Sequence, residues 1–114
     1  DEYNTSASQQ RNRRTAEENG IKAFHNRDYV SSRRELAQAR DLGADVNTML
    51  QAARAGSLLR EAQRIWQEEK DAEIGLEYLQ RALNLVQKNE IAEDAGITGE
   101  INSFQARLNA RRGS

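Results

Sequence analysis

Side chains that can take part in acid–base or metal chemistry are scarce in this chain. His25 is the only histidine among 114 residues, and there is no cysteine. A thiol dyad needs a cysteine and a metal site needs several ligands, so His25 lacks the usual partners for either. Asp28 follows shortly after and could orient the imidazole, although such a pair near a helix end is typical of solvated surface. We expect no catalytic residue, no metal site and no cofactor.

Longer catalytic and ion-binding motifs are missing as well. The stretch "DLGADVN", residues 41–47, places acids and an amide at alternating positions. A calcium loop would need a glutamate at its twelfth position, where Ala52 stands. The chain has no glycine-rich phosphate loop and no HExxH or GxSxG motif. The sequence therefore predicts a protein that is not an enzyme.

Arginine is the residue type with the greatest capacity for binding. It outnumbers lysine, and its planar guanidinium donates paired hydrogen bonds to carboxylates. Arg60 and Arg64 stand one helical turn apart and could hold an acidic segment of a partner. Alternatively, Arg64 could pair along its own helix with Glu61 or Glu68.

Two other basic clusters, Arg11 with Arg13 and Arg14, and Arg33 with Arg34, are the best case for phosphate or nucleic-acid contacts. No aromatic stacking residues are interleaved with them, and nearby glutamates can neutralise them. An acidic run, which we interpret as a solvated face, comprises Glu68, Glu69, Asp71, Glu73 and Glu77.

Helices must position these side chains. Ala, Leu, Glu, Gln and Arg dominate, proline is absent, and no alternating apolar run predicts a strand. The net charge of −1 creates no global attraction to nucleic acid or to an anionic membrane. No apolar run is long enough to span a membrane, so we expect a soluble protein, either cytoplasmic or from a bacterial periplasm or cell envelope. The first residue is Asp rather than Met, which indicates a processed chain or a fragment.

The spacing of apolar residues predicts about five helices in one domain over residues 11–112, preceded by a flexible polar lead-in over residues 1–10. The first helix is expected from about Arg11 to Asn26, and Asp28, Asp45 and Asp71 are expected to cap the next three. Gly43 is predicted to end the second helix in a left-handed conformation. Gly56 falls inside the third, which we expect to be one long or slightly bent helix.

Two parts of the chain repeat one pattern. Superposing Asp28 on Asp71, a spacing of 43 residues, aligns Leu36 with Leu79, Ala39 with Ala82, and Leu42 with Leu85. Both copies consist of a helix, a short polar turn and a second helix. With Gly20 and Phe24 in the first copy and Trp66 and Gly75 in the second, the layout resembles the tetratricopeptide repeat. It departs from that family in its longer spacing, in the missing terminal prolines, and at Ser32 and Gln63.

The resemblance implies an all-α fold of TPR-like stacked antiparallel helical hairpins that cover each other's apolar faces. A C-terminal capping helix, with an apolar stripe of Ile97, Ile101, Phe104 and Leu108, is expected to cover the second hairpin. A single three-helix bundle, as in microtubule-interacting trafficking domains, is the structural alternative, and the length of the chain argues against it.

The resemblance also implies a function, namely a protein-protein interaction module that binds a partner peptide or helix in a groove between the hairpins. The positions carried over to this groove are Arg14, Glu17, Ile21, Phe24 and His25 from the first copy, and Arg60, Arg64, Gln67 and Glu68 from the second. Two alternatives stay open. A second copy of the chain could fill the groove, making this a homo-oligomerisation domain, or the arginines could bind nucleic acid.

Overall fold

The computed structural model describes residues 2–89 and 96–112, and these residues form five helices without a strand. The helices are α1 (Glu2–His25), α2 (Tyr29–Asp41), α3 (Asn47–Glu69), α4 (Ala72–Lys88) and α5 (Ile97–Arg112). The predicted all-α fold with about five helices is confirmed.

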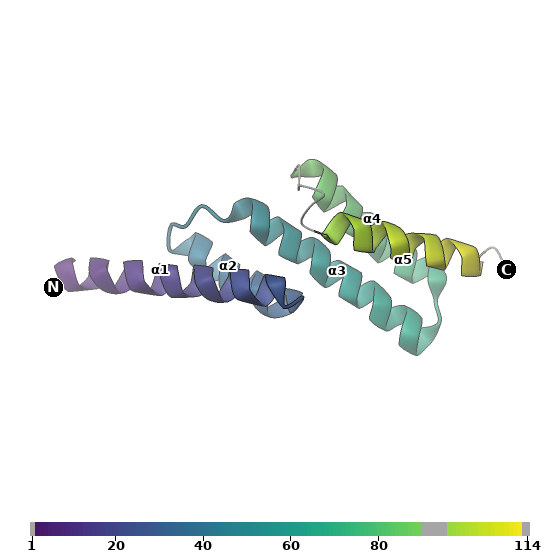
Figure 1. The fold of residues 1–114 in the computed structure, drawn as a ribbon, viewed down its shortest axis with the longest axis horizontal. Helices are drawn as coiled ribbons and strands as arrows, with labels where there is room; N and C mark the ends of the chain where they lie inside the picture. Colours follow the sequence, from purple (N-terminus) through teal and green to yellow (C-terminus); the bar gives the residue numbers. More distant parts are fainter. Residues whose placement is uncertain (1, 90–95, 113–114) are drawn as a thin grey trace.

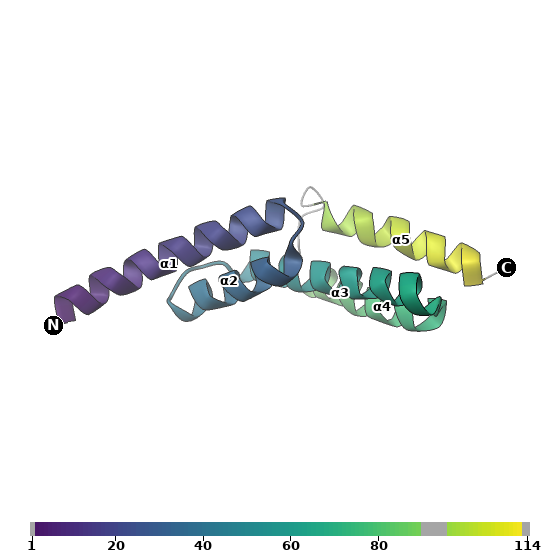
Figure 2. The same cartoon turned by 90° about the horizontal axis from the view of Figure 1, so that it is seen from below.

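The molecule is an elongated assembly of two helical hairpins and a final helix, with extents of 65 × 27 × 19 Å. α1 packs on α2, α3 packs on α4, and the contact between α2 and α3 joins the hairpins. α5 packs mainly on α4 and touches α3. In Figure 2, α1 and α5 follow one another along one side of the molecule, while α2, α3 and α4 lie along the other. The two hairpins are thus displaced along the long axis (Figure 1).

The helix ends agree with the sequence at two of three predicted caps. The Asp28 carboxylate accepts a hydrogen bond from Ser31 N at 3.3 Å, and the Asp71 carboxylate accepts one from Ile74 N at 3.0 Å. The hydrogen bonds from Ser31 hold the pKa of Asp28 below its usual range. The predicted cap at Asp45 is wrong, because α3 begins after Val46 with no side-chain cap bond.

Two further boundaries can be compared with the sequence. Gly43 has φ +103°, so the left-handed residue predicted after α2 is confirmed. α1 begins at Glu2 rather than near Arg11, so the polar residues 2–10 are helical instead of forming a lead-in before the helix. Their small side chains misled the prediction, although Ala, Gln and Glu support a helix and no glycine or proline interrupts it.

Glycines allow the close approaches between helices. Ser32 Oγ donates a hydrogen bond to Gly20 O at 2.8 Å, and a Cβ added at Gly20 would lie 2.6 Å from Leu36 Cδ2. α3 runs without a break through Gly56, as predicted, and Tyr29 packs against that glycine. These contacts bring α1 onto α2, and α2 onto α3.

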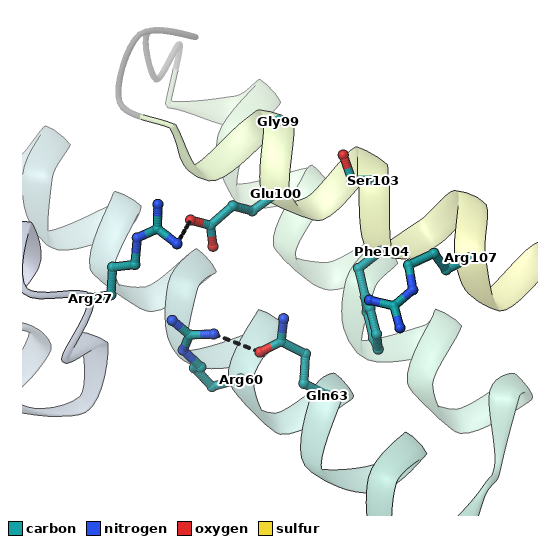
Figure 3. A pocket seen from close by; sticks show the side chains of 8 residues that line it. All are labelled: Arg27, Arg60, Gln63, Gly99, Glu100, Ser103, Phe104 and Arg107. Carbon is teal, nitrogen blue, oxygen red and sulfur yellow. Dashed lines mark hydrogen bonds and ion pairs between the residues drawn. The ribbon is translucent and has the colours of Figure 1, made fainter.

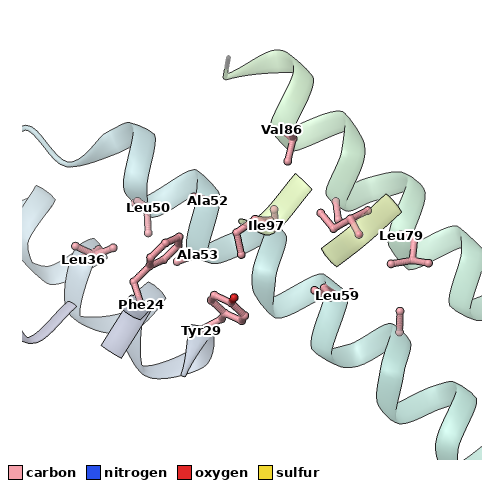
Figure 4. Close-up of a cluster of buried hydrophobic side chains, with 14 of the residues drawn as sticks. Phe24, Tyr29, Leu36, Leu50, Ala52, Ala53, Leu59, Leu79, Val86 and Ile97 are labelled. Atoms are coloured by element: carbon pink, nitrogen blue, oxygen red, sulfur yellow. The ribbon is translucent and has the colours of Figure 1, made fainter. Parts of the chain in front are cut away.

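The core is one continuous cluster of buried side chains drawn from all five helices (Figure 4). The aligned pairs Leu36 with Leu79 and Ala39 with Ala82 are all fully buried. The predicted stripe of α5, Ile97, Ile101, Phe104 and Leu108, is buried as well. Leu108 faces Gly75 of α4, where an added Cβ would lie 2.9 Å from Leu108 Cδ1. α5 therefore covers the second hairpin as the sequence predicts.

The contact of Tyr29 with Gly56 predicts a measurable cost for the smallest added side chain. A Cβ at Gly56 would lie 2.6 Å from Tyr29 Cδ1, so we expect Gly56→Ala to lower the free energy of unfolding by about 1–3 kcal/mol despite the better helix propensity of alanine. Gly99→Ala is the matched control, because a Cβ there meets nothing within 4 Å in the helical α5. This variant should gain up to about 1 kcal/mol from propensity alone. Urea denaturation measures both, and equal stability of the two variants would contradict the close approach.

Candidate functional site

An open groove of about 440 Å³ lies between α3, α5 and the turn that joins α1 to α2 (Figure 3). Its charged lining residues are three arginines and one glutamate. The described residues of this lining, which we call the arginine groove, are Arg27, Arg60, Gln63, Gly99, Glu100, Ser103, Phe104 and Arg107. Among the described residues Glu100 is its only acid, so the charged side chains of this lining carry a net positive charge.

Helical periodicity places most of this lining. On α5, Glu100 and Phe104 are four residues apart, and so are Ser103 and Arg107. These four residues therefore share one flank of that helix. Arg60 and Gln63 are one turn apart on α3. These two rows face each other across the groove in Figure 3.

Arg27 comes from the turn rather than from a helix. Its backbone adopts a left-handed φ of 63°, an uncommon conformation for a residue with a side chain. Two hydrogen bonds hold the turn, from Arg27 N to Phe24 O at 3.0 Å and from Asp28 N to Ala23 O at 2.9 Å. The reversal of the chain at this point directs the Arg27 side chain towards α5 (Figure 3).

The three arginines differ in their partners. Arg27 Nη1 lies 3.1 Å from Glu100 Oε1. Arg60 instead donates to Gln63 Oε1 at 2.7 Å, with its guanidinium 5.3 Å from the centre of the Tyr29 ring. The Arg107 guanidinium lies 5.7 Å from the centre of the Phe104 ring. Among residues 2–89 and 96–112, neither Arg60 nor Arg107 forms an ion pair with a carboxylate.

Tyr29 forms part of the support of the groove. Burial raises the pKa of its hydroxyl, and the negative charge of Glu100 raises it further. The phenol therefore stays neutral at physiological pH. A neutral aromatic ring is a suitable surface for the guanidinium of Arg60, because the negative face of the ring attracts the cation.

A smaller cavity of about 190 Å³ adjoins the arginine groove. It is lined by Phe24, His25, Arg27, Tyr29, Gly96 and Glu100, so Arg27 and Glu100 belong to both linings. The Phe24 ring packs edge-on against the rings of His25 and Tyr29, with centroid distances of 6.1 and 5.7 Å. His25 itself is exposed.

The structure brings only some of the predicted site residues together. Arg60 lines the arginine groove, and Phe24 and His25 line the smaller cavity. Phe24 is only 8% exposed and belongs to the core, so its ring supports the site rather than facing a ligand. The remaining predicted residues line neither cavity: Arg14, Glu17 and Ile21 on α1, and Arg64, Gln67 and Glu68 on α3.

Arg64 follows the alternative that the sequence left open. It bonds to Glu61 along α3, and its Nη1 lies 2.8 Å from Glu68 Oε2. These hydrogen bonds hold the pKa of Glu61 below its usual range and raise that of Arg64. Arg64 is therefore engaged on its own helix and does not extend the row begun by Arg60.

Sequence reasoning missed most of the groove. Arg27 falls between the end predicted for the first helix and the cap at Asp28, and Gln63 is identified in the sequence only as a departure from the repeat pattern. Glu100 and Arg107 lie beside the apolar stripe of α5. Glu100 is one turn before Phe104, and Arg107 is one turn after it. This polar flank was the available signal, because a helix that buries one stripe must expose the residues beside it.

Several other classes of site can be assessed from the described residues. They contain no cluster of three or more potential metal ligands from His, Cys, Asp and Glu. None of their helices combines the length and the apolar character that a membrane crossing requires. Comparison of the chain with protein-family models, with curated proteins and with solved structures finds no match in any of the three.

The ion pair between Arg27 and Glu100 is partly solvated, with side-chain exposures of 66% and 24%, so its contribution to stability should be small. We expect a double-mutant cycle with Arg27→Gln and Glu100→Gln to give a coupling free energy below about 1 kcal/mol. This coupling should decrease as salt is added. Urea denaturation of the four proteins at low and high salt measures it. A coupling several times larger, or one that salt leaves unchanged, would contradict a solvated pair.

Proposed function

We propose that this protein is a non-catalytic protein-interaction module that binds an acidic segment of a partner in the arginine groove. The observation that carries this proposal is the state of Arg60 and Arg107. Both guanidinium groups line an open groove, and neither has a carboxylate partner in the described part of the chain. An acidic side chain from another protein supplies each of them with a carboxylate partner that the described residues do not provide.

The two arginines are already held in position. Arg60 is fixed by its hydrogen bond to Gln63 and by the Tyr29 ring, and Arg107 lies against Phe104. A side chain that is ordered before binding loses less conformational entropy when the ligand arrives. The arrangement therefore favours a fixed contact over loose attraction between surface charges.

The size of the groove fits a short portion of a polypeptide. Its volume of about 440 Å³ accommodates a few side chains rather than a folded domain. The lining offers hydrogen-bond donors on both α3 and α5, so an extended or helical segment can contact both rows. The groove of the proposal thus lies between α3 and α5, whereas the resemblance to a tetratricopeptide repeat placed it along α1 and α3.

Nucleic acid suits this site less well. Sequence-independent binding of single strands uses exposed aromatic faces on which bases stack. Phe104, the aromatic residue in the lining of the arginine groove, is only 7% exposed. The net charge of the chain, −1, adds no long-range attraction to phosphates.

Self-association is a second candidate function, because the chain carries an acidic surface of its own. Glu68, Glu69, Glu73 and Glu77 are exposed around the turn from α3 to α4. A second copy can present these acids to the arginine groove, forming a head-to-tail contact. Light scattering at two protein concentrations tests this: the apparent mass should rise with concentration and fall when salt is added. A constant monomer mass would eliminate this candidate.

Charge reversal tests the binding of an acidic partner. We expect Arg60→Glu and Arg107→Glu each to weaken binding of fluorescein-labelled acidic peptides by about tenfold, because each removes a charge-assisted hydrogen bond and adds repulsion. Arg64→Glu is the matched control, since it makes the same charge change one turn away on α3 but outside the groove. Fluorescence anisotropy with a panel of glutamate-rich peptides measures the affinities.

The pattern across the three variants decides the outcome. Equal losses in all three would indicate attraction to the overall charge rather than binding in the groove. No loss for Arg60→Glu and Arg107→Glu would contradict the proposal. Circular dichroism melting curves of each variant establish that the altered protein is folded.

A further inference from the structure

A carboxylate of the chain itself already occupies one of the three arginines of the groove. Arg27 Nη1 lies 3.1 Å from Glu100 Oε1, and both residues line the arginine groove and the smaller adjoining cavity. The ion pair therefore stands where the two cavities meet. On one side are Arg60 and Arg107, and on the other is His25.

This ion pair joins two separate parts of the fold. Arg27 belongs to the turn between α1 and α2, while Glu100 lies in the first turn of α5 (Figure 3). The Arg27 side chain is 66% exposed, so a carboxylate arriving from solvent can reach its guanidinium. A solvated ion pair exchanges partners at little free-energy cost, because each partner is already hydrated in part.

We infer that Glu100 occupies the place on Arg27 that a carboxylate of the partner takes in the complex. When the partner binds, its carboxylate displaces Glu100 from Arg27. The inference rests on the proposed function and specifies the partner further. A segment that displaces Glu100 contacts Arg107, Arg60 and Arg27 in one continuous site. Such a partner carries at least two separated acidic residues, one for Arg60 or Arg107 and one for Arg27.

The composition of the two linings supports this assignment. Among the described residues, Glu100 is the only acid in either lining, and it pairs with Arg27, the one groove arginine with a carboxylate partner in that part of the chain. The carboxylate at Arg27 also indicates which anion the site accepts, because an arginine fork that binds one carboxylate can bind another in the same place. The group that Arg27 already binds is a carboxylate, as in an acidic peptide, and not a phosphate, as in a nucleic acid.

Removing the internal competitor should strengthen binding. With fluorescein-labelled peptides that carry one, two or three separated glutamates, we expect Glu100→Gln to raise the affinity for the second and third peptides about three- to fivefold. The gain should be smaller for the peptide with one glutamate, which can satisfy Arg60 or Arg107 without reaching Arg27. Glu18→Gln, an exposed site on α1 that lines neither cavity, makes the same charge change and is the control, which should leave the affinities unchanged within error.

Arg27→Gln separates a direct effect from a general one. If Glu100 competes for Arg27, the gain from Glu100→Gln must vanish in the double variant, because the arginine that the peptide would contact is gone. A gain that persists without Arg27 overturns the inference. The Arg27 Nε–Hε signal in a nitrogen–proton spectrum provides a readout independent of affinity, and it should shift when the peptide with two glutamates is added.

The two levels of the proposal fail in different ways. If Arg60→Glu and Arg107→Glu weaken binding but Glu100→Gln does not strengthen it, the groove binds acidic segments and the displacement of Glu100 is wrong. If Arg60→Glu and Arg107→Glu have no effect on any of the three peptides, the proposed function itself is wrong. Binding of single-stranded DNA that strengthens in Glu100→Gln as much as peptide binding does would overturn the assignment of a carboxylate partner.

Discussion

The contact between the Tyr29 ring and the backbone at Gly56 is the constraint on which the arrangement of this molecule depends. Because Gly56 has no side chain, the first residue of α2 rests directly on the middle of α3 and joins the two hairpins. The same ring carries the guanidinium of Arg60, one turn farther along α3. The turn with Arg27 lies immediately before Tyr29. One aromatic side chain therefore connects the core to two of the three arginines of the groove.

The displacement of the two hairpins explains why the groove lies where it does. α3 packs along α4 in the second hairpin, but it also receives α2 from the first, so the hairpins overlap along only part of their lengths (Figure 1). The beginning of α5 is thereby brought beside the turn between α1 and α2, as the Arg27–Glu100 ion pair shows. The arginine groove occupies this junction, where side chains from three segments distant in the sequence approach one another.

Periodicity and local capping made the helices predictable, whereas the site depended on contacts that periodicity does not report. The stripe of α5, the caps at Asp28 and Asp71, and the buried pairs Leu36 with Leu79 and Ala39 with Ala82 follow from spacing within one helix or from the repeat. The groove predicted from the resemblance and the arginine groove share only Arg60, because aligned positions carry over only if the hairpins stack in the same way. Arg64 is a second example. The sequence identifies Glu61 and Glu68 as its possible partners within the helix, but it does not decide whether Arg64 binds them or a ligand.

The order of packing along the chain has a consequence for how the protein folds. Nearly every extensive interface joins helices that follow one another in the sequence, the lesser contact of α3 with α5 being the exception. Such a topology needs no closure of a long loop before favourable contacts form, so we expect a low entropic barrier and rapid folding. It also leaves the outermost helices held chiefly by one neighbour each, and opening should therefore spread from the two ends of the rod towards α3, where amide protons exchange last.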